Sequence, residues 1–247
     1  MRTLTFASRN TKEITRDILT LIFGIVFPIV LLLLLSAINK GIPEGHGPDI
    51  FVISKLAPGI TVFGLSFLSL FSSMLIAKDR TTSFVLRLFT SPLKPSEFIL
   101  GYTLPLIPMA LIQTAVCYLC ALFLGLPFSL NLIVAVLVNL PIAIVFISLG
   151  LLFGSILNEK AVGGICGALL TNLSAWFSNI WFDTAMVGGA FKAVADILPF
   201  SHAVNAARAA VAGDFAAIFP DLWWVIGYAV VLLAAAVTVF AMKLKKN

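Results

Sequence analysis

The sequence predicts an all-α polytopic membrane protein with six transmembrane helices in a single domain, residues 1–247. Its residues are 60% hydrophobic and only 11% charged, and its mean hydropathy of +1.09 lies outside the range of soluble globular domains. Several uncharged stretches reach the ~20 residues that a helix needs to cross the ~30 Å hydrocarbon core. The ~10-residue alternating segments of a membrane β-barrel are absent from the sequence.

Six stretches have the length and composition of spans. They are residues 18–38, 56–77, 99–124, 131–157, 161–182 and 222–242. Between Ile99 and Leu157 there is no Asp, Glu, Lys, Arg or His, and the turn signal GLPFSLN at 125–131 divides this stretch into two helices. A signal peptide is the alternative for the first stretch, but 17 mostly polar residues precede it and no A-x-A-like site follows. We therefore expect a retained helix.

Lysine and arginine predict the orientation. With six spans both termini lie on one side, and that side collects twelve flanking cations against four on the other. The twelve are Arg2, Arg9, Lys12, Arg16, Lys78, Arg80, Arg87, Lys94, Lys160, Lys243, Lys245 and Lys246, and the four are Lys40, Lys55, Lys192 and Arg208. Because cationic loops resist translocation, the side with twelve is predicted to be cytoplasmic. The asymmetry accounts for the net charge of +5, which therefore gives no support to nucleic-acid binding.

Three segments outside the spans complete the expected architecture. Residues 1–17 read as a cytoplasmic interfacial segment, and residues 78–98 as a cytoplasmic loop with a short helix. Residues 183–221 read as an external segment that re-enters the outer leaflet or packs on the bundle. Within it, Ser201 is the expected N-cap of a short helix that ends at Gly213.

The external helix carries a candidate outer gate. His202, Asn205 and Arg208 recur every three residues along one polar flank. An arginine at membrane depth needs a partner, for which Asp196 and Asp214 are the expected candidates. Gating of the exit and structural pinning of the loop are both open alternatives.

Several function classes are excluded or disfavoured by what the spans lack. Ion-coupled transporters carry ionisable groups at membrane depth, and none is present in the predicted spans. No GxxxxGK[ST] loop occurs, so the chain is not expected to be an enzyme that binds ATP through a P-loop. Cys117, Cys120 and Cys166 lie inside apolar spans, and the CxxC spacing of the first two reads as packing. With His46 and His202 far apart, we expect neither a metal site nor a bound cofactor.

The loop at 78–98 contains an amphipathic helix. On a wheel of 100° per residue, Phe84, Val85, Leu88 and Phe89 share one face of residues 79–91. The opposite face carries Arg80, Ser83, Arg87 and Thr90. Pro92 ends this helix, and Ser96 is the expected N-cap of the next span, with Glu97 in its first turn. The helix either anchors the bundle on anionic lipid or docks a cytoplasmic partner and transmits force from it.

Prolines and small residues inside the spans leave two questions open. Pro28, Pro105, Pro108 and Pro141 predict kinks, which can be hinges or static packing features. Two pairs with GxxxG spacing, Gly150 with Gly154 and Gly163 with Gly167, allow helix backbones to approach closely. Each pair fits packing within the chain and a subunit interface equally well.

Residues 56–104 resemble the core of the ABC-2 type permeases, especially the drug-resistance and antibiotic-export branch. The features that match are Pro58-Gly59 at the start of the second span, the charged cluster Lys78-Asp79-Arg80, the run Arg87-Leu88-Phe89-Thr90-Ser91-Pro92 and the small residue Gly101. LPFSHAVNAAR at 198–208 is similar to the external motif of that family. One departure is KDRTTS where the family has "E-R-E-x-G", so Asp79 stands in for the acid and no glycine is present.

The resemblance implies the membrane-spanning subunit of an ABC exporter in the plasma membrane. Two such subunits, identical or paired with a paralogue, would each dock an ABC ATPase subunit that binds ATP and magnesium. The implied docking residues are Arg80, Ser83, Phe84, Arg87, Leu88 and Thr90. The 21 phenylalanines suit a lipophilic or amphipathic cargo such as a drug, antibiotic or lipid, as in multidrug efflux. The alternatives are a polysaccharide or glycolipid exporter of the same superfamily, and a membrane immunity or assembly subunit that transports nothing.

Overall fold

A computed structural model describes residues 2–43, 49–81 and 94–246, and all regular structure in these ranges is helical. The helices of the N-terminal half are α1 (Arg2–Arg16), α2 (Ile18–Leu21), the π-helix η1 (Ile22–Val26), α3 (Phe27–Gly41), the 3₁₀ turn η2 (Asp49–Phe51), α4 (Ile53–Thr81), α6 (Pro95–Thr103) and α7 (Leu106–Phe123). The others are α8 (Asn131–Ile156), α9 (Glu159–Val162), the π-helix η3 (Gly163–Leu170), α10 (Thr171–Trp176), α11 (Thr184–Val187), α12 (Gly189–Ile197), α13 (Pro199–Ala212) and α14 (Phe215–Lys246).

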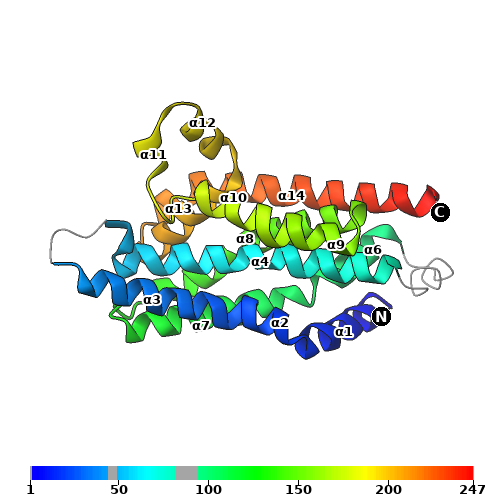
Figure 1. Cartoon of the computed structure of the whole chain (residues 1–247), viewed down its shortest axis with the longest axis horizontal. Coiled ribbons are helices and arrows are strands. Elements are labelled where there is room, and N and C mark those ends of the chain that lie inside the picture. Colours follow the sequence, from blue (N-terminus) through cyan, green and yellow to red (C-terminus); the bar gives the residue numbers. More distant parts are fainter. Residues whose placement is uncertain (1, 44–48, 82–93, 247) are drawn as a thin grey trace.

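The described chain contains five helical stretches that are long and apolar enough to cross a membrane. They are Ile18–Gly41, Ile53–Thr81, Pro95–Phe123, Asn131–Ile156 and Phe215–Lys243. The all-α, multi-pass fold is thereby confirmed, whereas the predicted number of six spans is not. The predicted span at 161–182 corresponds to α9, η3 and α10 in succession, and this run lies along α4 (Figure 1).

Helix α4 lies at the centre of the bundle, with 83% of its apolar window buried. It packs most extensively on α8, where two glycines permit backbone contact. A Cβ added at Gly150 would lie 2.1 Å from the Ser69 carbonyl oxygen, and one at Gly154 would lie 2.5 Å from that of Ser73. This glycine pair therefore packs within the chain. Gly163 differs, because a Cβ there would meet no atom within 4 Å.

Two predicted helix boundaries are correct. Gly125 adopts φ +106° in the turn between α7 and α8, and Gly213 adopts φ +78° just after α13. These are left-handed backbone conformations that glycine adopts without a Cβ clash. Pro105 separates α6 from α7, so the predicted third span consists of two helices.

Two predicted N-caps are wrong, for one physical reason. Helix α6 begins at Pro95 after the N-cap Lys94, whose backbone N–H donates to Glu97 Oε2 at 2.7 Å, so Ser96 lies inside the helix. Helix α13 likewise begins at Pro199, and the Ser201 hydroxyl donates to the Ala195 carbonyl at 2.8 Å. Proline starts both helices because its fixed φ suits the first helical position, where no N–H is needed.

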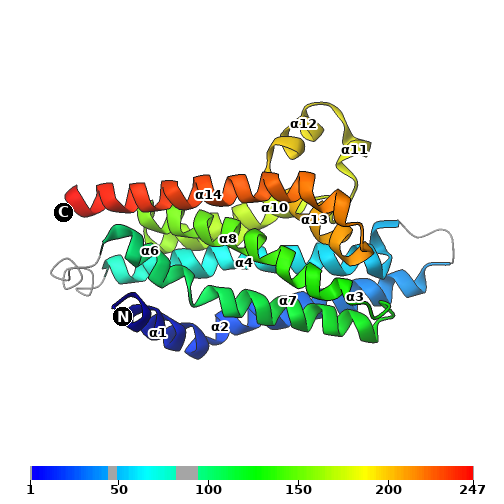
Figure 2. The ribbon, with the colours of Figure 1, turned by 180° about the vertical axis from the view of Figure 1, so that it is seen from behind.

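Both ends of the chain lie at the same end of the bundle, which we call the terminal end (Figures 1 and 2). Helix α4 ends there, and α6 and α9 begin there. Helix α13 lies toward the opposite end, and α11 and α12 project beside it (Figure 2). Arg80 and the predicted gate residues of α13 thus lie at opposite ends of the bundle.

Candidate functional site

A buried carboxylate organises the terminal end. Asp79, in the last turn of α4, is 3% exposed. The Arg9 guanidinium of α1 donates to both of its oxygens, Nη1 to Oδ2 and Nη2 to Oδ1, each at 2.7 Å. The Tyr102 hydroxyl of α6 donates to Oδ2 at 2.9 Å. The hydrogen bond to Asp79 raises the pKa of Arg9 above its usual value. A bidentate, charge-assisted pair of this kind fixes the relative orientation of α1 and α4.

Helix α1 packs on α6 through an apolar contact that only a small residue permits. The Phe6 ring meets the Tyr102 ring edge to face, with centroids 4.9 Å apart. A Cβ at Gly101 would lie 2.3 Å from Phe6 Cδ1, and Asn10 Nδ2 donates to the Gly101 carbonyl at 3.1 Å. Helix α1 therefore packs directly against Gly101. This close contact explains why a small residue is needed at position 101.

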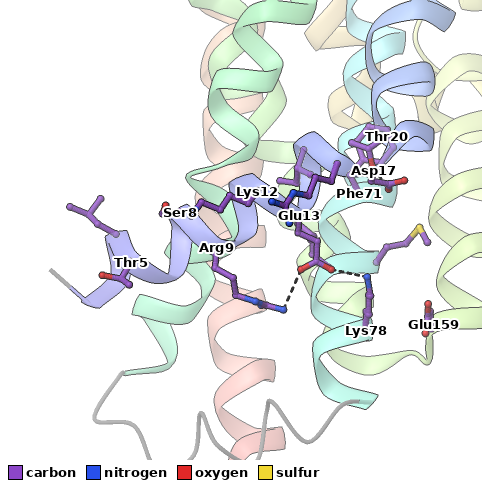
Figure 3. A pocket seen from close by; sticks show the side chains of 15 residues that line it. Thr5, Ser8, Arg9, Lys12, Glu13, Asp17, Thr20, Phe71, Lys78 and Glu159 are labelled. Atoms are coloured by element: carbon purple, nitrogen blue, oxygen red, sulfur yellow. Dashed lines mark hydrogen bonds and ion pairs between the residues drawn. The ribbon is translucent and has the colours of Figure 1, made fainter.

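Ion pairs extend the cluster across the surface of α1 (Figure 3). Glu13 lies 3.2 Å from Arg9 and 2.8 Å from Lys78, measured between carboxylate oxygen and side-chain nitrogen. The three side chains come from α1 and the end of α4. Surface pairs of this kind contribute little individually, so we assign most of the attachment of α1 to Asp79 and Phe6.

Arg80 is the one predicted docking residue whose position the structure describes. Its Nη1 donates to the carbonyls of Gly154 at 2.8 Å and Leu157 at 3.2 Å, at the end of α8. A helix leaves its last carbonyls without internal partners, and Arg80 satisfies two of them. Ser83, Phe84, Arg87, Leu88 and Thr90 lie outside the described residues. Their docking role, and that of Arg80, stays a prediction.

At the opposite end, His202 joins three helices. Its Nδ1 lies 2.5 Å from Asp221 Oδ1 of α14, and its Nε2 lies 2.9 Å from the Asp196 carbonyl of α12. A carbonyl and a carboxylate both accept hydrogen bonds, so the doubly protonated imidazolium satisfies both contacts. The hydrogen bond to Asp221 accordingly raises the pKa of His202, against an opposing effect of burial.

Arg208 of α13 hydrogen-bonds to backbone carbonyls of two other segments. Its Nη2 donates to the Asn179 carbonyl at 2.9 Å, and its Nε donates to that of Lys55 at 3.2 Å. The expected partners Asp196 and Asp214 were therefore wrong. The Asp196 carboxylate pairs instead with Lys192, and that of Asp214 accepts the Ala217 N–H. Asn205 is half-buried on the same helix.

No cluster of three or more His, Cys, Asp or Glu that could hold a metal occurs in residues 2–43, 49–81 and 94–246. The groups at the two ends instead connect helices: Asp79 and Arg80 fix α4 at the terminal end, and His202 and Arg208 fix α13 at the other.

Comparison with known families decides the assignment. Residues 1–211 match the family described as ABC-2 type transporter. The chain belongs to the ABC-2 type transporter family. A similar protein is the ABC transporter G family member 20 of Dictyostelium discoideum, which is 26% identical over 231 residues. That alignment covers 86% of this chain but only 29% of the relative, so the chain spans less than a third of its length.

The family confirms the resemblance drawn from residues 56–104. An ABC-2 membrane domain is the transmembrane permease component of a transporter and not a nucleotide-binding domain. In this ABC-2 chain Pro58 and Gly59 lie near the start of α4, at the other end of that helix from Asp79. A Cβ at Gly59 would lie 3.5 Å from Ile180 and 3.7 Å from Arg208 Nη2. The Pro58-Gly59 pair and the 198–208 motif are therefore close in space.

Three residues of the terminal cluster were not predicted from the sequence. In the sequence Arg9 reads only as a flanking cation, and no sequence pattern distinguishes Asn10 or Tyr102. Asn10 is fully buried although it lies in a polar segment. Its burial would have been detectable only from the spacing of Phe6, Asn10 and Ile14, which places them on one face of a helix.

Proposed function

We propose that this ABC-2 chain is the transmembrane subunit of an ATP-driven exporter that moves a lipophilic or amphipathic substrate out of the cytoplasm or inner leaflet. The observation that carries the proposal is the family match over residues 1–211 together with five apolar helices. An ABC ATPase partner supplies the energy, since the matched domain is a permease component. A second permease subunit, identical or a paralogue, encloses the path.

The proposed topology has six crossings with both termini in the cytoplasm. The run from α9 to α10 is added to the five long helices as the fifth crossing in chain order, and its position along α4 supports that placement. The common location of both chain ends fits an even number of crossings. The excess of cationic residues flanking the terminal end supports its assignment to the cytoplasmic side of the plasma membrane.

Docking of the ATPase is assigned to the segment that follows α4. Helix α4 is held at its last turn by α1, α6 and α8 through Asp79 and Arg80. A partner that pushes on the next residues would therefore move α4 and its neighbours together. Phe84 and Leu88 are proposed as the apolar anchors, and Arg87 as a rim contact that orients the partner.

The apolar spans support the proposed class of cargo. Residues 99–157 contain no Asp, Glu, Lys, Arg or His, and a strongly polar cargo would need polar lining groups. A transport assay tests both the cargo and the direction of transport. Proteoliposomes containing both subunits should accumulate a fluorescent amphiphile only when ATP is on the side of the ATPase.

Pull-down of the ATPase tests the proposal. The tagged chain is purified from its native membranes in detergent, and an ATPase with nucleotide-binding motifs should co-purify with it. Each buried apolar anchor contributes ~2 kcal/mol or more, so Phe84→Ala or Leu88→Ala should weaken association ~30-fold. The matched control is Phe128→Ala with Leu130→Ala, two exposed apolar residues in the loop before α8.

The outcomes separate the two parts of the proposal. If no ATPase accompanies the wild-type chain, the proposed function is wrong. If the Phe84→Ala, Leu88→Ala double variant retains the ATPase as fully as the control does, the docking site is wrong and the function stands.

A further inference from the structure

A groove at the terminal end, which we call the α1 groove, separates α1 and α2 from α4 and Glu159 of α9 (Figure 3). Its volume is about 1200 Å³. The α4 side provides an apolar floor of Phe71, Met74 and Leu75. The α1 side provides polar and charged residues.

The cations of α1 divide into two groups by their contacts. Arg9 is held by Asp79 and Glu13. Lys12 and Arg16 are exposed and have no ion pair in the part of the chain that the structure describes. They lie one helical turn apart, so they project on the same face of α1.

Helix geometry explains why these two cations face the groove. At ~100° per residue, Lys12 lies ~120° from Phe6 and ~160° from Asn10 around the helix, and Arg16 lies ~80° and ~120° from them. The face that carries Phe6 and Asn10 packs on α6. Lys12 and Arg16 therefore point to another side of α1, and both line the groove.

The acidic residues that line the groove are largely engaged elsewhere. Glu13 pairs with Arg9 and Lys78. The Asp17 carboxylate accepts the Leu19 N–H at 3.1 Å and the Thr20 hydroxyl at 2.6 Å, which caps α2. Glu159 stands on the α9 side, where its charge acts on Lys78. The α1 side is thus the cationic side of the groove.

We propose that the α1 groove binds one anionic phospholipid, with its phosphate between Lys12 and Arg16 and its first acyl carbons on Phe71, Met74 and Leu75. The inference rests on the proposed function for one point, the placement of α1 at the cytoplasmic membrane surface. The paired cations match a phosphate diester, and the apolar floor matches an acyl chain. A free phosphate would make no use of that floor.

The bound lipid would also stabilise the docked position of α1. Lys12 and Arg16 share their helix with Arg9, which holds Asp79 at the end of α4. A lipid whose phosphate binds Lys12 and Arg16 and whose acyl chain contacts the apolar residues of α4 therefore connects α1 to α4. This connection is additional to the Arg9–Asp79 pair. The site links the lipid composition of the leaflet to the junction where the ATPase is proposed to act.

Native mass spectrometry of the full-length chain in detergent tests the inference. The chain is titrated with phosphatidylglycerol and with phosphatidylcholine of the same acyl chains. We expect wild type to prefer the anionic lipid at least tenfold. Each juxtamembrane cation changes affinity for anionic lipid about fivefold, so Lys12→Gln with Arg16→Gln should weaken phosphatidylglycerol binding ~25-fold. Binding of phosphatidylcholine should weaken less, because its choline cation offsets the charge of its phosphate.

The matched control removes two cations elsewhere. Lys40→Gln with Lys192→Gln lowers the charge equally, and both residues are exposed and lie outside the groove. This variant should keep the lipid preference. A third variant, Met74→Gln, should weaken both lipids because it makes the floor polar.

Three results would overturn the proposal. They are equal affinity for the two lipids in wild type, an unchanged preference in the Lys12, Arg16 double variant, and displacement of phosphatidylglycerol by millimolar inorganic phosphate. The titration needs neither ATPase nor cargo, so it fails or succeeds independently of the proposed transport function.

Discussion

Replacing Asp79 with asparagine should loosen α1 from the bundle. The substitution keeps the size of the side chain but removes the charge that receives two hydrogen bonds from Arg9 and one from Tyr102. Breaking a buried ion pair costs ~3–5 kcal/mol. The Arg9 side chain is 38% exposed, so solvent screens the guanidinium that is left behind, and we take ~2 kcal/mol as the expected loss.

Hydrogen exchange of the α1 amides measures this loss directly. When α1 detaches rarely and reattaches quickly, the exchange rate follows the free energy of local opening. A change of ~2 kcal/mol then predicts ~30-fold faster exchange across α1. Amides in the middle of α8, which is held by other contacts, should keep their protection. The measurement uses the full chain in detergent micelles.

A double-mutant cycle shows whether the effect belongs to the Arg9–Asp79 pair. Arg9→Gln should cost more than Asp79→Asn, because it leaves the buried Asp79 carboxylate without its cation. The double variant should cost less than the sum of the two single variants, because both remove the same interaction. Asp49→Asn is the matched control. Its pair with Lys55 spans 3.2 Å, and the Asp49 side chain is 88% exposed, so it should leave α1 exchange unchanged. Unaltered α1 protection in Asp79→Asn would refute the assignment of Asp79 as the attachment point of α1.

Three further predictions concern packing, pH and topology. Gly150→Ala should lower the melting temperature because the added Cβ meets the Ser69 carbonyl oxygen at 2.1 Å, whereas Gly227→Ala, with no atom within 4 Å, should not; equal melting temperatures would contradict the packing argument. The raised pKa of His202 means that its contact with Asp221 stabilises the fold fully below its unfolded pKa of ~6.5 and is lost as pH rises through the higher folded pKa. Melting temperature should therefore fall more steeply from pH 6 to 9 in wild type than in His202→Gln, and parallel curves would argue against the imidazolium. In a background without native cysteines, single cysteines at Gly45 and Asp214 should react with an impermeant thiol reagent outside intact cells and one at Ser91 should not; the reverse pattern would invert the proposed orientation.

The long apolar helices could be predicted because composition alone decides them. A stretch of ~20 uncharged residues has few alternatives to a membrane helix. Gly125 after α7 and Gly213 after α13 have positive φ, which is why glycine signals these helix ends in the sequence. The 161–182 stretch is different. The charged start of α9 and the polar residues of α10 make the run less apolar, and its middle forms the π-helix η3, which no rule of sequence spacing indicates.

The N-cap errors show how one local rule can override another. Serine is a favoured N-cap, which is why Ser96 and Ser201 were the expected helix starts. In both places a proline lies one or two residues earlier and begins the helix itself. Weighing the proline first would have placed both boundaries correctly.

The site contacts could not be predicted for a geometric reason. Arg9 and Asp79 lie seventy residues apart in sequence, and rules for charge pairs compare only neighbours on one helix. The partners of Arg208 are backbone carbonyls, which every residue carries, so the sequence does not distinguish them. Side-chain chemistry identified Arg208 as needing partners, but the fold determined which groups these are.

Helix α4 is a rigid connection between the two ends of the bundle. Its 29 residues measure about 43 Å at 1.5 Å per residue. Close contacts with Gly150 and Gly154 of α8 at Ser69 and Ser73 leave no room for α4 to slide along α8, and Arg80 bonds the last turn of α4 to the carbonyls of Gly154 and Leu157. A displacement applied near Asp79 would therefore carry α8 with α4. It would reach the other end of α4, where Arg208 donates to the Lys55 carbonyl.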